Sequence, residues 1–297
     1  MDHRELIASL PREQKQDLTR KSDLKGLSAL AMHAGAILIF GMLIALKVRY
    51  WPLLMVPQGI LIIFLFTTLH ETIHRTAFAT PWINDAVARV CGFLILLPSE
   101  WFRFFHFAHH RHTQDPNRDP ELASPKPETK TQYLLHVSGL PVWISHIRTL
   151  VNNALGHCRD DFVPPAARKR IALEARVMLS LYTLLVIASL AIGSALLLHV
   201  WILPVIFGQP FLRLYLLAEH GRCAFAANMF ENSRTTFTNR VVRRLAWNMP
   251  YHAEHHAFPG VPFHKLPEFH TLTRPHLLET EKGYVRFHEK YARSLEG

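Results

Sequence analysis

The stretch that decides the fold is Trp51-Pro-Leu-Leu-Met-Val-Pro-Gln-Gly-Ile-Leu-Ile-Ile-Phe-Leu-Phe-Thr-Thr-Leu69, which runs directly into His70-Glu-Thr-Ile-His74. A helix needs about 20 apolar residues to cross roughly 30 Å of hydrocarbon, and this stretch has that length. Side chains four residues apart lie on one face of a helix. We therefore expect a membrane-spanning helix that presents a pair of imidazoles at one membrane surface.

Three other segments are apolar over a similar length. They are Leu27–Leu46, Val177–Leu198 and Trp201–Leu217, and the last two are separated by a very short turn around His199 and Val200. Together with the first stretch they predict an all-α integral membrane protein with four transmembrane helices in two hairpins.

Two shorter apolar segments, Ala86–Pro98 and Tyr133–Leu150, are too short or too polar to span a bilayer comfortably. We expect them to form interfacial or re-entrant helices. The chain then divides into a polar N-terminal segment (1–26), a transmembrane core with a large loop (27–220) and a C-terminal tail (221–297). No signal peptide is visible, because the first 26 residues are polar and charged.

The placement of basic residues predicts the orientation. Lysine and arginine are frequent in the N-terminal segment, the central loop and the tail, and the turn between the third and fourth spans has none. By the positive-inside rule, both termini and the central loop are cytoplasmic, as in a bacterial inner-membrane protein. The net charge of +10 fits contact with anionic lipid and docking of an acidic electron carrier. No compact basic domain indicates a nucleic-acid partner.

Two more histidine clusters follow the first, His106-Phe-Ala-His109-His110 and His252-Ala-Glu-His255-His256. Imidazole is the commonest metal-binding side chain, and neutral imidazole suits transition metals such as iron. The predicted topology places all three clusters on the cytoplasmic side. So many converging imidazoles fit two metal ions better than one, and a site at the membrane indicates an apolar substrate. Together these features favour dioxygen activation at a di-iron centre, forming a histidine-rich cytoplasmic cap.

Two alternatives use the same histidines differently. His70-Glu71-Thr-Ile-His74 matches the H-E-x-x-H helix of zinc metalloproteases, but such a site needs only three protein ligands and leaves the other clusters unexplained. A metal transporter would need polar residues along its spans. The first two spans offer little beyond His33 and Gln58.

The order of the clusters, H-x-x-x-H, H-x-x-H-H and H-x-x-H-H, resembles the integral-membrane fatty acid desaturase and hydroxylase superfamily over roughly residues 50–275. The resemblance implies a non-haem di-iron site, dioxygen as co-substrate, and electrons from an external donor, either ferredoxin or cytochrome b5. In this family a further histidine often comes from the end of the fourth span, and His220 matches that position. Some members have an asparagine one turn before it, which is replaced here by Leu216. The implied metal ligands are His70, His74, His106, His109, His110, His220, His252, His255 and His256.

Metal-bound imidazoles usually donate their other N–H to a nearby acceptor. Candidates for such supporting positions, whose other interpretation is capping or solvated charge, are Glu71, Glu254, Asn248 and Asp115, with Asp119 and Glu219 also close in sequence. His112 follows the second box and is expected at a surface or supporting position, with a tenth metal ligand as its alternative. Arg213 lies seven residues before His220, roughly 10 Å along a helix. It is a candidate for holding a substrate carboxylate or headgroup, unless it snorkels toward the interface.

The ligand set alone does not choose between reaction outcomes. Removal of two neighbouring hydrogens from a fatty acyl chain gives an alkene, and this desaturation is our first expectation from the resemblance. Hydroxylation or ketolation of a lipid, alkane or carotenoid is the second. Decarboxylation of a free fatty acid to a terminal alkene is the third, and it would need a cation to hold the carboxylate near the metals.

Overall fold

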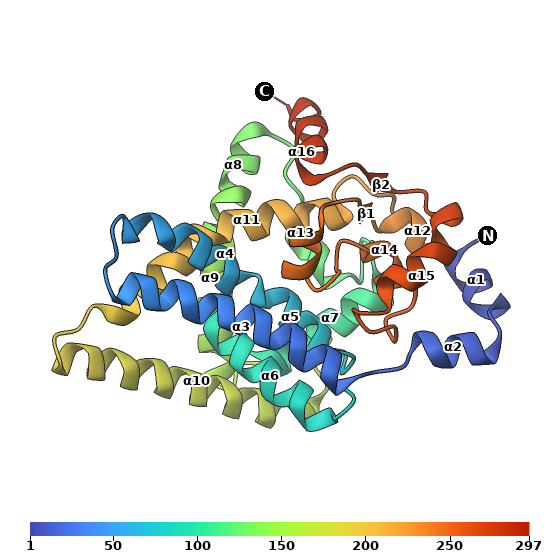
Figure 1. Ribbon diagram of the computed structural model, residues 1–297. Helices are drawn as coiled ribbons and strands as arrows, with labels where there is room; N and C mark the ends of the chain where they lie inside the picture. Colours follow the sequence, from blue (N-terminus) through green and yellow to red (C-terminus); the bar gives the residue numbers. More distant parts are fainter. Residues whose placement is uncertain (297) are drawn as a thin grey trace.

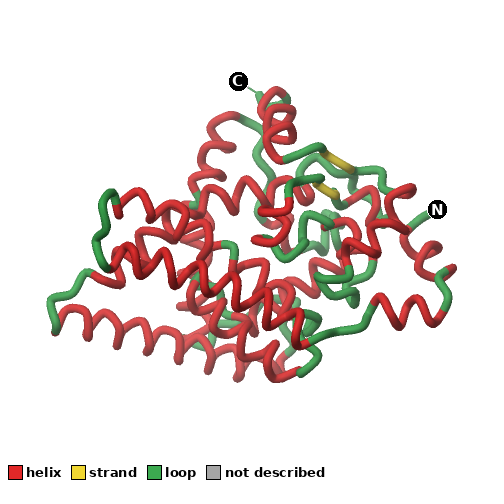
Figure 2. Tube along the Cα trace, viewed as in Figure 1, coloured by secondary structure: helices red, strands yellow, loops and turns green. Residues whose placement is uncertain are grey.

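Four long apolar helices organise the protein in the computed structural model, which describes residues 1–296 (Figure 1). The helices able to cross a membrane are Arg12–Ala45, Trp51–Ile73, Pro165–Ala191 and Leu198–His220. They confirm the predicted membrane fold, and almost all the remaining secondary structure is helical (Figure 2).

The spans are built from α2 (Arg12–Leu18) and α3 (Asp23–Ala45), then η1 (Trp51–Leu54), α4 (Met55–Ile63) and α5 (Leu65–Ile73), then α10 (Pro165–Ala191), and finally η3 (Leu198–Ile202) and α11 (Leu203–His220). Large apolar side chains of α10 remain exposed, among them Leu181, Leu184 and Leu190. An exposed apolar surface of this kind is suited to contact with lipid and not with water.

The second and fourth spans touch backbone to backbone. A Cβ atom added to Gly59 in α4 would lie 1.8 Å from the Pro204 carbonyl oxygen, and one added to Gly208 in α11 would lie 2.2 Å from the Gly59 carbonyl oxygen. Small residues of this kind let membrane helices approach closely. This contact holds the two helices that end in His70–His74 and His220 side by side.

The turn between the third and fourth spans lies earlier than predicted. The sequence placed it at His199 and Val200, but α10 already ends at Ala191, and η3 begins the next helix at Leu198. Gly193 adopts φ +61°, a left-handed conformation that ends a helix at little cost for glycine. The apolar residues after it belong to the turn and the fourth span, which is why composition alone misplaced the boundary.

The two shorter apolar segments each include a bend. Ala86–Pro98 falls mostly within α6 (Pro81–Leu94), which meets α7 (Ser99–His112) at an angle of 101°. Tyr133–Leu150 is divided at Gly139 into α8 (Lys130–Ser138) and α9 (Leu140–Ala154). The bend after α6 turns α7 and its histidines back toward the spans.

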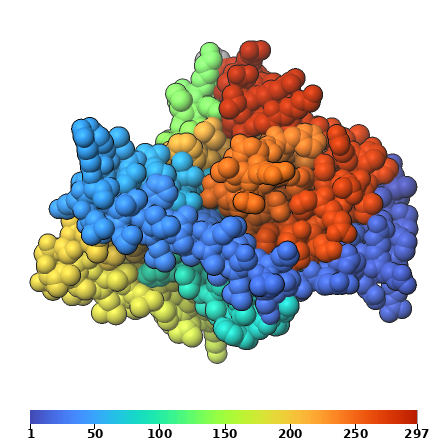
Figure 3. Space-filling view, in the orientation of Figure 1, coloured from blue at the N-terminus to red at the C-terminus, as the bar shows by residue number. Residues whose placement is uncertain are grey.

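The C-terminal part covers one end of the helical core, beside the N-terminal helix α1 (His3–Ser9) (Figure 3). It includes two short strands that pair in parallel, Thr235 with Thr280 and Thr236 with Glu281. The elements of the C-terminal part are α12 (Met229–Asn232), β1 (Thr235–Thr236), α13 (Arg240–Leu245), α14 (His252–Ala257), α15 (Leu266–Thr273), η4 (Arg274–His276), β2 (Thr280–Glu281) and α16 (Tyr284–Arg293). The central loop contains one further short helix, η2 (Pro120–Ala123).

Candidate metal centre

All nine histidines expected to bind metal converge at the end of the spans. Their ring nitrogens form two groups, within each of which the candidate ligand atoms lie within 4.8 Å of one another. The first group is His70, His74, His106, His110 and His255, and the second is His109, His220 and His256. His252 joins the second group, because its Nε2 lies 2.9 Å from Nε2 of His220.

Hydrogen bonds fix the ring orientation in the second group. Nδ1 of His109 donates to Asp119 Oδ1 at 2.9 Å, and Nδ1 of His220 donates to the Asn232 carbonyl at 3.0 Å. A carboxylate and a carbonyl can only accept, so both Nδ1 atoms carry the hydrogen. The two Nε2 atoms, which are then the metal-binding atoms, face each other 3.2 Å apart.

His256 completes this arrangement. Its Nδ1 lies 3.1 Å from Thr113 Oγ1, whose own hydrogen goes to the His109 carbonyl at 2.8 Å. Nδ1 of His256 is therefore the donor, and its Nε2 is left without a partner among residues 1–296. Three converging Nε2 lone pairs repel one another unless a cation lies between them. One proton can bridge two rings but not three, so the arrangement fits a metal ion.

The first group is equally close but has fewer supporting contacts. Nε2 of His110 lies 2.8 Å from Nε2 of His106 and 3.2 Å from Nε2 of His255. Both ring nitrogens of the fully buried His70 have no hydrogen-bond partner in the described chain. Buried polar atoms are rarely left unpaired, so these nitrogens also fit ligands of a metal ion.

Burial favours the metal-binding protonation state. It lowers the pKa of His255 and His256 well below 6.5, and it lowers the pKa of His74 to about 3. These rings are therefore neutral at physiological pH, which is the form that binds transition metals. His109 differs, because the carboxylates of Glu121 and Asp119 raise its pKa although burial opposes them. The surroundings of His109 thus attract positive charge.

Glu121 is a site residue that the sequence patterns missed. Its Oε2 lies 3.5 Å from Nε2 of His109, and its Oε1 forms an ion pair with Lys126. Burial alone would raise the pKa of Glu121, but Lys126 and His109 lower it, so the group is an ionised carboxylate. It is positioned to share a metal with the second histidine group. Glu121 lies outside all three histidine boxes, so no sequence motif indicated this role.

The other acidic candidates differ in what they contact. Asp119 orients His109, and a Glu219 carboxylate oxygen lies 3.4 Å from Nδ1 of His252. Glu71 accepts a hydrogen bond from the Phe263 backbone N–H at 2.9 Å. Glu254 accepts from Thr235 and pairs with His270. Glu71 therefore holds the C-terminal part against the helices, and Glu254 joins segments within that part. Neither is hydrogen-bonded to a candidate ligand among the described residues.

Asn248, Asp115 and His112 belong to neither histidine group and do not line the cavity. The Asn248 side-chain amide donates to the Phe263 carbonyl at 3.0 Å, and Asp115 pairs with Arg118. His112 is half-buried at the end of α7. None of these side chains is hydrogen-bonded to a candidate ligand in the part of the chain that the structure describes.

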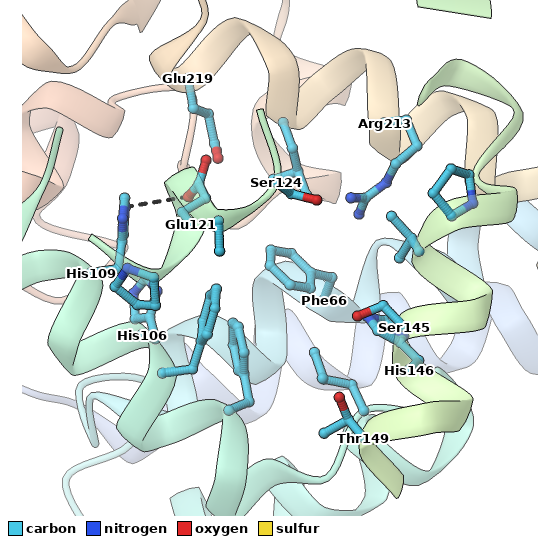
Figure 4. Close-up of a pocket in the computed structure, with 18 of the residues that line it drawn as sticks. Phe66, His106, His109, Glu121, Ser124, Ser145, His146, Thr149, Arg213 and Glu219 are labelled. Carbon is cyan, nitrogen blue, oxygen red and sulfur yellow. Dashed lines mark ion pairs between the residues drawn. The ribbon is translucent and has the colours of Figure 1, made fainter. Parts of the chain in front are cut away.

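A cavity of about 550 Å³ opens from the metal centre into the helical core. His70, His106, His109 and His252 line one part of it. Figure 4 shows Phe66 in the middle of the cavity, with His106 and His109 on one side and Arg213 on the other. Further aromatic wall residues are Trp101, Phe102, Phe105 and Phe162. The cavity thus has an aromatic wall between the imidazoles and a guanidinium, and its lining also includes the charged side chains of Glu121, Lys126 and Glu219.

Spans, histidine groups and cavity together define a membrane protein with a buried polyhistidine metal centre. The family model described as "Fatty acid desaturase" matches residues 45–289. The chain therefore belongs to the fatty acid desaturase family, which is a family of oxidoreductases.

Curated relatives are distant. The chain is 23% identical over 265 residues to an acyl-lipid omega-3 desaturase (cytochrome b5) of the endoplasmic reticulum from Arabidopsis thaliana, covering 80% of this chain and 68% of the relative. It is 26% identical over 196 residues to a Delta(12)-acyl-lipid-desaturase from Punica granatum, covering 59% and 50%. An sn-1 acyl-lipid omega-3 desaturase (ferredoxin) from Nostoc sp. (strain 36) is 29% identical over 102 residues, covering 33% and 28%.

Proposed function

We propose that the nine histidines and Glu121 hold two iron ions and that the protein desaturates a fatty acyl chain with dioxygen. The lone-pair convergence of His109, His220 and His256 is the observation that carries the metal assignment. Iron bound there would activate dioxygen. The balanced reaction converts –CH2–CH2– to –CH=CH–, and dioxygen, two electrons and two protons form two molecules of water.

The chain itself would bind and position the substrate. The aromatic wall formed by Phe66, Phe102 and Phe105 suits an alkyl chain and excludes water from the space beside His70 and His106. Positioning matters because angstrom-scale displacement of a reacting bond strongly changes its rate. These side chains would decide which C–H bonds face the metal centre.

We place both termini and the metal centre on the cytoplasmic side of a bacterial inner membrane, following the distribution of basic residues. The electrons would come from a separate protein. The names of two relatives specify cytochrome b5 and ferredoxin. Basic surface residues near the metal centre would suit an acidic carrier of either kind.

A free fatty acid as substrate is favoured by Arg213, which lies in the cavity wall. A guanidinium there would hold a free carboxylate away from the metal centre, which suits desaturation or hydroxylation along the chain better than decarboxylation. No observation in the chain favours a carotenoid or an alkane over a fatty acid.

Lipid analysis of aerated cells that express the protein tests the proposal. We expect a new internal double bond in the fatty acids, and cells with His255→Ala provide the control. If the product is a hydroxylated acid, the reaction is hydroxylation and not desaturation. If it is a terminal alkene one carbon shorter, the reaction is decarboxylation. If purified protein binds no iron and the two cell lines make identical lipids, the proposed function is wrong.

A further inference from the structure

Arg213 places a positive charge in the wall of the cavity and inside the fourth span. It belongs to α11, seven residues before His220. No carboxylate of residues 1–296 lies within 4 Å of its guanidinium nitrogens, and its Nε has no hydrogen-bond partner among them. An unpaired charge in such a position is costly, so intramembrane cations normally have a counter-ion.

The carboxylates that share the cavity have other partners. Glu121 is paired with Lys126, Glu219 lies beside His252, and Asp160 accepts a hydrogen bond from the Trp101 indole N–H. Glu121 and Glu219 are on the metal side of the cavity in Figure 4, and the Arg213 side chain points into the cavity, with its guanidinium on the side of Ser124. Glu121 and Glu219 attract the charge of Arg213 at longer range, but neither forms an ion pair with its guanidinium, which therefore lacks a direct partner among residues 1–296.

Polar residues surround Arg213 in one part of the cavity, which we call the Arg213 pocket. His136 of α8 and His146 of α9 line the cavity, with Ser145 and Thr149 beside them. Nε2 of His136 and Nδ1 of His146 have no hydrogen-bond partner within the described residues. Burial and the charge of Arg213 lower the pKa of His136 to about 4 and that of His146 to about 3. Both rings are therefore neutral. Each has a single N–H, for which the backbone carbonyl of Arg213 or of Ile95 is already an acceptor.

We propose that Arg213 binds the carboxylate of an unesterified fatty acid, beside the neutral rings of His136 and His146, and that the chain of the acid extends along the aromatic wall to the metal centre. This inference rests on the proposed function and names its substrate class. A carboxylate matches the guanidinium fork and neutralises its charge. An ester or thioester carbonyl carries no charge and would leave the cation unpaired.

The position of Arg213 also limits which carbons react. Seven helical residues separate it from His220, which corresponds to about 10 Å. The carbons that reach the imidazoles would therefore lie at a fixed distance along the chain from the carboxylate, and not directly beside it. The relatives are named as acyl-lipid desaturases, so a free-acid substrate would distinguish this chain from them.

Binding without turnover tests the inference independently of the reaction. The iron-loaded protein in detergent, kept anaerobic and without an electron donor, is titrated with palmitic acid and with methyl palmitate. We expect the Kd for palmitic acid to be at least about tenfold lower, equivalent to about 1.4 kcal/mol. Equal Kd values would overturn the inference, whether or not the enzyme turns over.

Variants identify the residue responsible. Arg213→Met is expected to raise the Kd for palmitic acid about tenfold or more and to leave that for methyl palmitate unchanged. Arg240→Met, which removes an exposed arginine of α13 outside the cavity, is the matched control and is expected to change neither. An unchanged Kd in Arg213→Met would overturn the inference. If that variant does not accumulate, the comparison of acid and ester in the unmodified protein decides alone.

A phospholipid headgroup is another source of negative charge. Phosphatidylglycerol with two palmitoyl chains is therefore added as a competitor. We expect it to displace palmitic acid no better than phosphatidylcholine does. Selective displacement by phosphatidylglycerol would assign the Arg213 pocket to a lipid headgroup and overturn the free-acid inference.

Discussion

The Glu121 carboxylate lies 3.5 Å from Nε2 of His109, in the group that has fewer histidines. Five imidazoles form the first group, while His109, His220 and His256, with His252 beside them, form the second. A carboxylate at this position would make the two groups similar in ligand number. It would also reduce the charge of the second metal ion, which neutral imidazoles leave unchanged.

Glu121→Gln is expected to lower the iron occupancy of the second group and leave the first group loaded, because an amide is a weaker ligand than a carboxylate. The iron-to-protein ratio measures the loss, and Mössbauer spectroscopy shows whether one iron environment disappears. Lys126→Met is the control, since it removes the ion pair and keeps the carboxylate. Equal iron loss in both variants would mean that Glu121 serves only the Lys126 ion pair.

Asp119→Asn is expected to weaken iron binding by about 10- to 100-fold, the usual effect of losing the acceptor that orients a metal-binding imidazole. Asp119 accepts from Nδ1 of His109, and an amide can present N–H there instead. Competition with a chelator measures the affinity. Asp115→Asn in the same loop is the control, because Asp115 pairs with Arg118 at the surface. An unchanged affinity in Asp119→Asn would remove Asp119 from the metal centre.

The sequence located the candidate ligands because their spacing is local. A helix places residues three and four apart on one face, so each box could be recognised without knowing the fold. His220 lies outside the boxes and required the family resemblance. Glu121, His136 and His146 could not be found in either way, because separate loops and helices bring them to the cavity only after folding.

The spans were predicted from composition, and their ends were not. Hydropathy identifies a segment that is long enough to cross a bilayer, but it does not show where the backbone turns. The turn at Gly193 depends on a single left-handed residue within a continuous apolar run. The contact of Gly59 with Gly208 joins segments about 150 residues apart, which no local pattern reports.

Gly59→Ala is expected to destabilise the protein by about 1–3 kcal/mol, the usual cost of overpacking. The new methyl group would lie 1.8 Å from the Pro204 carbonyl oxygen, so α4 and α11 would have to separate. Thermal unfolding in detergent measures the effect. Gly35→Ala in α3 is the control, because its added Cβ meets nothing within 4 Å and alanine favours a helix. Equal melting temperatures for the two variants would contradict the close helix contact.

The N-terminal helix α1 is expected to detach from the C-terminal part as the pH falls below about 6.5, the ordinary pKa of histidine. His3 is buried, and its Nδ1 accepts a hydrogen bond from the Met229 backbone N–H at 3.2 Å. Burial lowers the pKa of His3, with a smaller opposing effect from Asn228. The detached helix therefore binds the proton more tightly than the docked one. Docking is fully stable above pH 6.5 and is lost as the pH falls toward the lowered pKa.

Hydrogen exchange of the α1 amides measures this change. Exchange at pH 5.5, corrected for the intrinsic dependence on pH, should be faster than at pH 7.5, while amides of α10 remain unchanged. His3→Asn keeps a polar side chain but does not titrate, so its α1 amides should lose the pH dependence. If the His3→Asn variant shows the same dependence as the unmodified protein, another group controls the docking of α1.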